Sequence, residues 1–319
     1  MSVVQCARVE DKMTREDFTF DSRDGKTKIH AVRWMPEAEK PVCILQIVHG
    51  MCEHVERYEA FAEYLTSKGF LVTAEDHLGH GKTCTDEKYG FFCKQDPATV
   101  VVRDVHRLKK ITEEKYPGTP YFILGHSMGS FILRNYLFRY GKGIDGAIVM
   151  GTGMQPKFMA MMLKCMASIS CFFGGAAKPS KFIEKIAFGS YLKKIDNPRT
   201  PFDWLTHDEK IVDKYIEDPL CGFTFPGNGF KTMGELLCRL CKETNLSKMP
   251  VTLRVLITSG AQDPVGDYGA GPSKLYSSFL AEGMQRVDLK LYDDDRHEVL
   301  NEFDKETVYE DIYNWIMKA

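Results

Sequence analysis

A serine flanked by glycines lies near the middle of the chain, in the segment GHSMG at residues 125–129. The apolar run 121–127 has the pattern of a buried strand, and the residues after Ser127 repeat at helical spacing. A serine at a sharp strand-to-helix turn presents its hydroxyl above the sheet, where it can attack a carbonyl carbon. The glycines are needed because neighbouring backbone packs too closely there for Cβ atoms. The pattern predicts a nucleophile at Ser127.

The base and the acid that such a serine requires are found towards the C-terminus. A serine hydroxyl is a poor nucleophile until a base takes its proton. In this kind of site an acid and then a histidine follow the serine along the chain, each after a strand. Asp263 follows the apolar run 251–260, and His297 follows the run 287–294 and is the only histidine after residue 207. We predict that Asp263 holds the His297 imidazole and stabilises its charged form.

Other carboxylates near these strand ends are alternatives for the acid. Asp267 is the rival of Asp263, although it lies further from the end of the strand. The three aspartates at 293–295 have the pattern of a solvated loop, and the chain order places the acid earlier. The acid is therefore expected at Asp263, with Asp267 as the second candidate.

Two backbone amides should stabilise the oxyanion that forms when the serine attacks. One is the N–H of Met128, at the start of the helix after the serine. The other should come from the loop after the first core strand, His49-Gly50-Met51, where the N–H of Met51 is our choice. The alternative for Met51 is an amide bound only to water.

These segments must be positioned by a sheet, and short apolar runs do alternate with helical patterns along the chain. Strand–helix alternation predicts an α/β protein with a mostly parallel central sheet and helices on both faces. Two antiparallel strands are expected near the N-terminus, in DFTFDS and KIHAVRW. The runs with strand character are 43–50, 70–76, 121–127, 144–150, 251–260 and 287–294.

The alternation stops after Met150 and resumes near residue 231. We therefore predict a core formed by residues 1–150 and 231–319, with a helical cap inserted at 151–230. Within the cap, the stretch 158–177 holds one charge, Lys164. A membrane span needs about 20 apolar residues, but the central lysine and the Gly174-Gly175 pair favour an apolar lid helix. Its methionines, 159, 161, 162 and 166, would be flexible fillers against a substrate tail or packing between cap and core.

Composition excludes several classes of protein. The chain has 319 residues, of which 44% are hydrophobic and 27% charged, with a net charge of −2. This is a globular composition without the basic excess that nucleic-acid binding requires. The N-terminal segment has no apolar run of the kind found in secretory leaders. The ten cysteines show no disulfide framework, so free thiols in a reducing cytoplasm are expected. Cys238 and Cys241 form one CxxC, which lacks the second pair that a zinc site needs.

Five ordered motifs give the chain a family resemblance: HGMCEHVERY (49–58), DHLGHGKT (76–83), GHSMGS (125–130), Asp263-Pro264-Val265 and RHEVLNE (296–302). They resemble monoacylglycerol lipases and bacterial lysophospholipase-type hydrolases, which are serine α/β-hydrolases sometimes grouped with serine aminopeptidases. The resemblance implies an α/β-hydrolase fold, an acyl-ester substrate in an apolar channel under the cap, and neither metal nor organic cofactor. It is weakest in the cap.

The resemblance also suggests roles for residues around the first motif. Glu53 and Arg57 would lie near the polar leaving group, and their alternative is an ordinary helix ion pair at i, i+4. His54 and His80 would brace loops, and His126 would point into the sheet environment. Cys52 departs from the small residue or glycine of many relatives, and its side chain would narrow the oxyanion side of the site.

The predicted function is therefore hydrolysis of carboxylic esters through an acyl-enzyme on Ser127, on a monoacylglycerol, a lysophospholipid or another small acyl ester. An aminopeptidase of the same fold is the first alternative and would need a cap carboxylate such as Glu184, Asp196 or Asp203 for the substrate amine. A thioesterase or acyltransferase, and a non-catalytic binding protein, are the others. Transient contact of the cap with a membrane surface is expected; the oligomeric state is not set by the sequence.

Overall fold

The computed structural model describes residues 13–84, 86 and 88–318. The prediction that the chain starts without a secretory leader concerns residues 1–12 above all, and these lie outside the described residues. Eight strands of the described chain form one sheet in the order β1-β2-β4-β3-β5-β6-β7-β8. Their bounds are Thr14–Asp21, Lys28–Met35, Cys43–Val48 and Phe70–Glu75 for β1 to β4, then Tyr121–His126, Gly146–Met150, Arg254–Gly260 and Val287–Tyr292 for β5 to β8.

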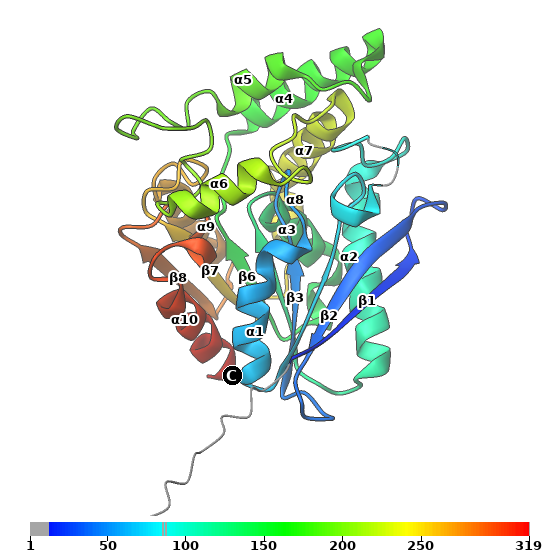
Figure 1. Ribbon diagram of the computed structural model, residues 1–319, viewed down its shortest axis with the longest axis vertical. Helices are drawn as coiled ribbons and strands as arrows, with labels where there is room; N and C mark the ends of the chain where they lie inside the picture. Colours follow the sequence, from blue (N-terminus) through cyan, green and yellow to red (C-terminus); the bar gives the residue numbers. More distant parts are fainter. Residues whose placement is uncertain (1–12, 85, 87, 319) are drawn as a thin grey trace, which may run out of the picture.

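The sheet is parallel except at one edge (Figure 1). β1 pairs antiparallel with β2, and β2 pairs antiparallel with β4. The remaining neighbours are parallel. Parallel strands connected through helices require apolar side chains on both faces, which is why their runs are almost continuously apolar. The topology confirms the predicted α/β-hydrolase fold.

Helices cover both faces of the sheet. Along β5, Phe122 and Leu124 belong to one buried cluster and Ile123 to the other, as alternation along a strand demands. The first cluster contains the apolar sides of α1 (Glu59–Ser67) and α10 (Lys305–Met317). The second contains those of α2 (Pro97–Lys115), α3 (Met128–Tyr140) and α9 (Ala270–Ala281). Short 3-10 turns occur at Val55–Tyr58 (η1), Gly81–Thr83 (η2), Gly141–Gly143 (η3) and Val299–Asn301 (η5).

A group of helices between β6 and β7 lies over one end of the sheet (Figure 1). It includes α4 (Lys157–Ser170), the π-helical turn η4 (Cys171–Gly175), α5 (Lys181–Phe188), α6 (Glu209–Glu217) and α7 (Gly227–Leu240). The short helix α8 (Glu243–Leu246) follows α7 on the side of the core. The helix α7 spans the predicted boundary at residue 230 and packs against both α4 and α3. It therefore belongs to cap and core together, and the boundaries at 151 and 230 stay predictions.

The apolar stretch expected to form a lid helix lies in this cap. Residues Lys157–Gly175 are long and apolar enough to cross a membrane by length and composition alone, and few of them are buried in the fold. At Gly174 the backbone has a φ of +84°, and regular helix ends around it. The stretch is thus one surface helix of the cap with a broken C-terminal turn.

Two glycines let the first turn of α3 approach the sheet closely. A Cβ at Gly125 would overlap the carbonyl of Gly129, and a Cβ at Gly129 would overlap the carbonyl of Val48 at the end of β3. The predicted need for glycine on both sides of Ser127 is therefore confirmed, and its cause is contact between three backbone segments.

Replacing Gly129 by alanine should lower the free energy of unfolding by at least about 2 kcal/mol, because a clash with backbone cannot be relieved by a rotamer change. Gly143→Ala is the matched control, since this exposed glycine would bring its Cβ no nearer than 3.7 Å to Lys109 Nζ. It should change stability by about 0.5 kcal/mol or less. Urea unfolding followed by circular dichroism measures both, and equal midpoints would contradict the close approach.

Candidate active site

Ser127 occupies the sharp turn between β5 and α3. Its backbone adopts φ 54° and ψ −121°, a region that side chains other than glycine rarely enter. Its N–H donates to Met150 O at 3.0 Å, and its carbonyl accepts from Ser130 N–H at 2.9 Å. Such strain persists only where the surrounding structure holds it. The turn therefore has the conformation of a nucleophile elbow.

His297 and Asp263 come from the loops after β8 and β7. The distance from His297 Nδ1 to Asp263 Oδ2 is 2.9 Å, and both side chains are buried. Asp263 also accepts from Val265 N–H at 2.8 Å and from Ser259 Oγ at 3.2 Å. Its carboxylate is thus fixed on three sides, and the bond to Nδ1 leaves Nε2 of the imidazole for another partner.

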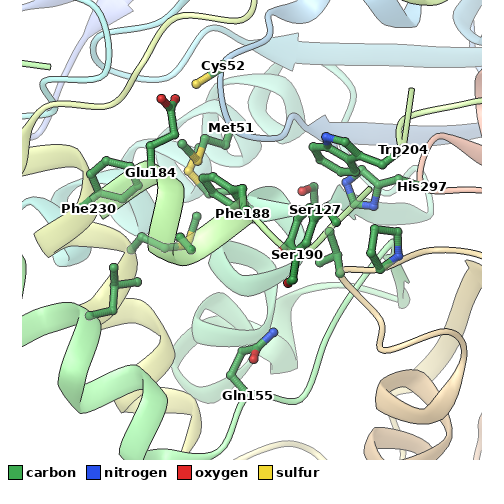
Figure 2. A pocket seen from close by; sticks show the side chains of 18 of the residues that line it. Met51, Cys52, Ser127, Gln155, Glu184, Phe188, Ser190, Trp204, Phe230 and His297 are labelled. Atoms are coloured by element: carbon green, nitrogen blue, oxygen red, sulfur yellow. The ribbon is translucent and has the colours of Figure 1, made fainter. Parts of the chain in front are cut away.

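Ser127 and His297 line the same cavity and lie next to each other in it (Figure 2). Among the described residues, no hydrogen bond joins Ser127 Oγ to His297. Such bonds are often long before a substrate binds and tighten in the complex. The structure thus brings the three predicted residues into one place, with the histidine–aspartate half of the relay formed.

The rival acids have other surroundings. Asp267 is exposed at the rim of the cavity, and Asp293 and Asp294 are exposed in the loop after β8. Asp295 is buried and does not fit the predicted solvated run. Burial and the neighbouring Asp304 and Glu302 raise the pKa of Asp295 to about 8.

The two predicted oxyanion donors border the cavity close to Ser127. Met51 follows β3 in the loop that carries Glu53, and Met128 is the first residue of α3. In the part of the chain that the structure describes, neither backbone N–H has a protein acceptor. A free amide at the start of a helix is a ready anion donor. The arrangement fits an oxyanion site, and the assignment stays a prediction.

Glu53 is buried and bound on several sides, and it shapes the loop of Met51. Its Oε1 accepts from Gly50 N–H at 2.5 Å and from Tyr58 OH at 2.8 Å, and its Oε2 accepts from Arg57 Nη1 at 2.8 Å. Burial opposes its charged form, but the hydrogen bond with His126 and the charge of Arg57 hold the pKa of Glu53 well below its ordinary value. A charged carboxylate therefore braces this loop from inside.

Arg57 completes a buried network between two loops. It donates to both carboxylate oxygens of Glu298, at 2.6 and 2.7 Å, and lies 4.8 Å from the ring centroid of Tyr215. The ion pair of Glu53 and Arg57 that the spacing suggested is present. Both residues also border the cavity, so their predicted role near the leaving group stays a prediction beside this structural one.

The remaining residues of the first motif connect loops. His54 Nε2 lies 2.8 Å from Asp218 Oδ2, and the ring of His80 donates to Leu78 O at 3.0 Å, as expected of bracing histidines. His126 contacts Glu53 at 3.3 Å but also borders the cavity, which its predicted orientation did not include. Cys52 Sγ donates to Phe223 O in the cap at 2.8 Å.

A cavity of about 830 Å³ lies between cap and core above Ser127. Its walls are mostly apolar and come from α4, α5, α7 and the cap loops (Figure 2). Met159, Met162 and Met166 line it as predicted. Met161 does not, because it points outwards from α4 and is 50% exposed. The volume lies in the range of sites for small organic molecules.

Several cavity residues had no signal in the sequence. Trp204 lies with its ring centroid 5.0 Å from that of His297, and Phe188 and Ser190 line the same cavity. Trp204 comes from a cap loop and Phe188 from the last turn of α5, and only long-range packing brings them to the site. Glu298 had a weak signal, since it is a carboxylate directly after the predicted base.

The three cap carboxylates considered for binding an amine do not gather at the cavity. Glu184 lines it and accepts from Thr224 Oγ1 at 2.9 Å. Asp203 accepts a hydrogen bond from the Thr200 N–H at 3.0 Å and closes a turn, and Asp196 is exposed.

Among the described residues, the side chains that could together hold a metal ion are His54, Asp218 and Cys221. None of these three lines the cavity.

Comparison with known proteins extends these observations. The family model "Serine aminopeptidase, S33" matches residues 39–304. A monoacylglycerol lipase of Mycolicibacterium smegmatis is 26% identical over 95% of this chain and 98% of its own length. A monoglyceride lipase of Rattus norvegicus is 26% identical over 89% of this chain and 84% of its own.

A solved structure is similar over almost the whole chain. The thermostable carboxyl esterase from Bacillus coagulans, crystallised in complex with glycerol, is 33% identical, with a TM-score of 0.88 over 96% of this chain and 99% of the esterase. The predicted resemblance is thereby confirmed. The chain is a hydrolase of the α/β-hydrolase fold and belongs to the serine aminopeptidase S33 family.

Proposed function

We propose that this chain hydrolyses carboxylic esters of single-chain lipids, monoacylglycerols above all, through an acyl-enzyme on Ser127. The observation that carries the proposal is the buried pair of His297 and Asp263, 2.9 Å apart, beside an elbow serine in a largely apolar cavity. Further support comes from the lipases and the esterase to which the chain is similar.

In the proposed cycle, Ser127 Oγ attacks the ester carbonyl carbon while His297 Nε2 takes its proton. The oxyanion is stabilised by the amides of Met51 and Met128, each worth about 3 kcal/mol in comparable sites. His297 then protonates the departing alcohol, which leaves the acyl group on the serine. A water molecule attacks this ester in the same way, and the acid and the free serine are released.

The walls of the cavity support a lipid tail as the acyl part. Met159, Leu163, Met166, Phe188 and Phe230 line it from the cap side. Each methylene group that moves from water into the cavity contributes about 0.8 kcal/mol to the free energy of binding. Longer acyl chains should therefore bind more tightly until the cavity is filled. A polar region with Glu184 and Thr224 gives the alcohol part hydrogen-bond partners.

An aminopeptidase remains the second candidate because Glu184 is a carboxylate within the cavity. A free α-amine would pair with it. However, Lys181 and Lys185 line the cavity as well, so the region has no excess of negative charge. An assay with aminoacyl anilides separates the two activities, and turnover of these alone would overturn the ester proposal.

We also infer that the cap contacts a membrane surface. Phe172 and Phe173 are 84% and 81% exposed, and they belong to η4, directly after the cap helix α4 (Figure 1). Other exposed apolar side chains of α4 and α5 are Phe158, Met159, Met161, Ile169, Phe182 and Ile186, of which Met159 and Ile186 also border the cavity. Exposed lysines at 157, 178 and 181 belong to the same segment of the chain, and a mixture of lysine and apolar residues is typical of helices that lie in an anionic interface.

A cytoplasmic location is part of the proposal. Nine cysteines of the described chain carry free thiols, and four of them are buried. Unpaired cysteines in this number are typical of reducing compartments.

Ser127→Ala should abolish ester hydrolysis, with a loss of about 10⁶-fold in kcat, since the nucleophile acts as a unit with its base. Turnover of a p-nitrophenyl ester measures the loss, and labelling by a fluorophosphonate should disappear with it. The thermal midpoint should stay within a few degrees of wild type. Turnover that survives the substitution would refute the assignment of Ser127.

Asp263→Asn should lower kcat by about 10⁴-fold, because the amide no longer holds the His297 tautomer that accepts the serine proton. Asp267→Asn is the matched control at the exposed rim and should change kcat by less than about threefold, as a surface position does. Steady-state kinetics of both variants provide the test. A large loss in the second variant instead of the first would show that the acid is Asp267.

The double variant Phe172→Ser, Phe173→Ser should bind vesicles of anionic phospholipid at least about tenfold more weakly. Serine lacks the favourable free energy that a phenylalanine side chain gains when it moves from water into the membrane. Phe303→Ser is the control, since this residue is 73% exposed on the core. Vesicle sedimentation measures binding, and hydrolysis of a water-soluble ester should stay at the wild-type rate. Equal binding of the two variants would exclude this face as the membrane contact.

A further inference from the structure

The cap is fastened to the loop of Met51 at a small junction beside the active site. The carbonyl of Cys52 accepts from Gly222 N–H at 3.1 Å and from Tyr215 OH at 3.0 Å. The thiol of Cys52 donates to Phe223 O in return. Residues 218–223 of the cap therefore lie directly against residues 50–54 of the core.

Three different metal-binding side chains meet at this junction. His54 Nε2, a carboxylate oxygen of Asp218 and Cys221 Sγ all lie within 4.8 Å of one another. His54 comes from the core, and the other two come from the cap turn after α6. Within the described residues, these three side chains are the histidine, cysteine or acidic residues whose ligand atoms converge closely enough to hold an ion.

The backbone of the cap turn prepares two of these donors. Cys221 N–H donates to Asp218 O at 3.0 Å, and Leu220 N–H donates to Asp218 Oδ1 at 2.8 Å. The turn thus places residues i and i+3 on one side and leaves Oδ2 directed to His54, 2.8 Å from Nε2. Cys221 Sγ makes no hydrogen bond to the described residues, although its side chain is buried beside Tyr215.

We propose that His54, Asp218 and Cys221 bind one Zn²⁺ ion that clamps the cap turn onto the loop carrying Met51. Imidazole, carboxylate and thiolate are all zinc ligands, and the thiolate disfavours Mg²⁺ and Ca²⁺. On binding, the ion replaces the hydrogen bond between His54 Nε2 and Asp218 Oδ2. The neutral ring moves its hydrogen from Nε2 to Nδ1, and the Cys221 thiol releases its proton to solvent. The ion is then balanced by one thiolate and one carboxylate, so no net charge is buried.

The exposure of the three side chains fits entry of an ion from one side. The side chain of Asp218 is 31% exposed, whereas that of His54 is 6% exposed and Cys221 is buried. A fourth ligand position faces the solvent beside Asp218 and would hold water, as in sites with three protein ligands. The buried remainder shields the bonds to sulfur and nitrogen from exchange.

The proposal is tested on the full chain without a polyhistidine tag, stripped with a chelator and then titrated with Co²⁺. Cobalt bound by a thiolate should give a near-ultraviolet charge-transfer band that saturates at one equivalent and is lost when Zn²⁺ is added. Zn²⁺ should also raise the thermal midpoint of wild type, because it binds the folded state alone. Cys221→Ser should lose the band, and Asp218→Asn should bind Zn²⁺ at least about tenfold more weakly.

Cys238→Ser is the matched control, because it removes a thiol of the CxxC pair and leaves the junction intact. It should keep the band, the stoichiometry and the shift of the midpoint. The second readout, on Asp218→Asn, covers the case in which Cys221→Ser does not fold. A band that survives Cys221→Ser, a band lost in Cys238→Ser, or no stoichiometric binding to wild type at micromolar Zn²⁺ would each overturn the proposal.

Discussion

The buried carboxylate of Glu53 is the interaction on which the geometry of the site depends. It accepts hydrogen bonds from the loop after β3 and from Tyr58, and it pairs with Arg57. Arg57 continues to Glu298, next to the histidine of the site. A charge is costly in an apolar interior unless it is paired on all sides. The network can therefore exist only when both loops are in place, and this makes the positions of Met51 and His297 interdependent.

The elements of the core were predictable because burial on both faces leaves a clear trace in the sequence. Each expected strand is present within about three residues, as for the run 121–127 and β5, Tyr121–His126. Ser127, Asp263 and His297 were predicted because a serine, an acid and a histidine follow successive strands in a fixed chain order in this kind of site. A rule about strand ends needs no knowledge of long-range packing.

The cap was predictable as a helical insertion and not in its details. Met161 shares its composition with Met159 and Met162, yet it faces solvent, because the direction of a side chain depends on how α4 packs on α7. Trp204 reaches the cavity from a cap loop without periodicity, and Phe188 reaches it from the end of α5. The cap side of the cavity is thus formed by tertiary contacts that no local pattern encodes, while the predicted catalytic residues lie in the core.

The conformation of Cys52 has a consequence for how this position can change. Its backbone has a φ of +56°, which costs a residue with a side chain about 1–2 kcal/mol, while its sulfur reaches the cap. Glycine would relax the backbone and release that tether, and alanine would keep the strain without any contact in return. Substitution at this position therefore exchanges relief of backbone strain against attachment of the cap to the core. Cysteine is a small residue that keeps the attachment.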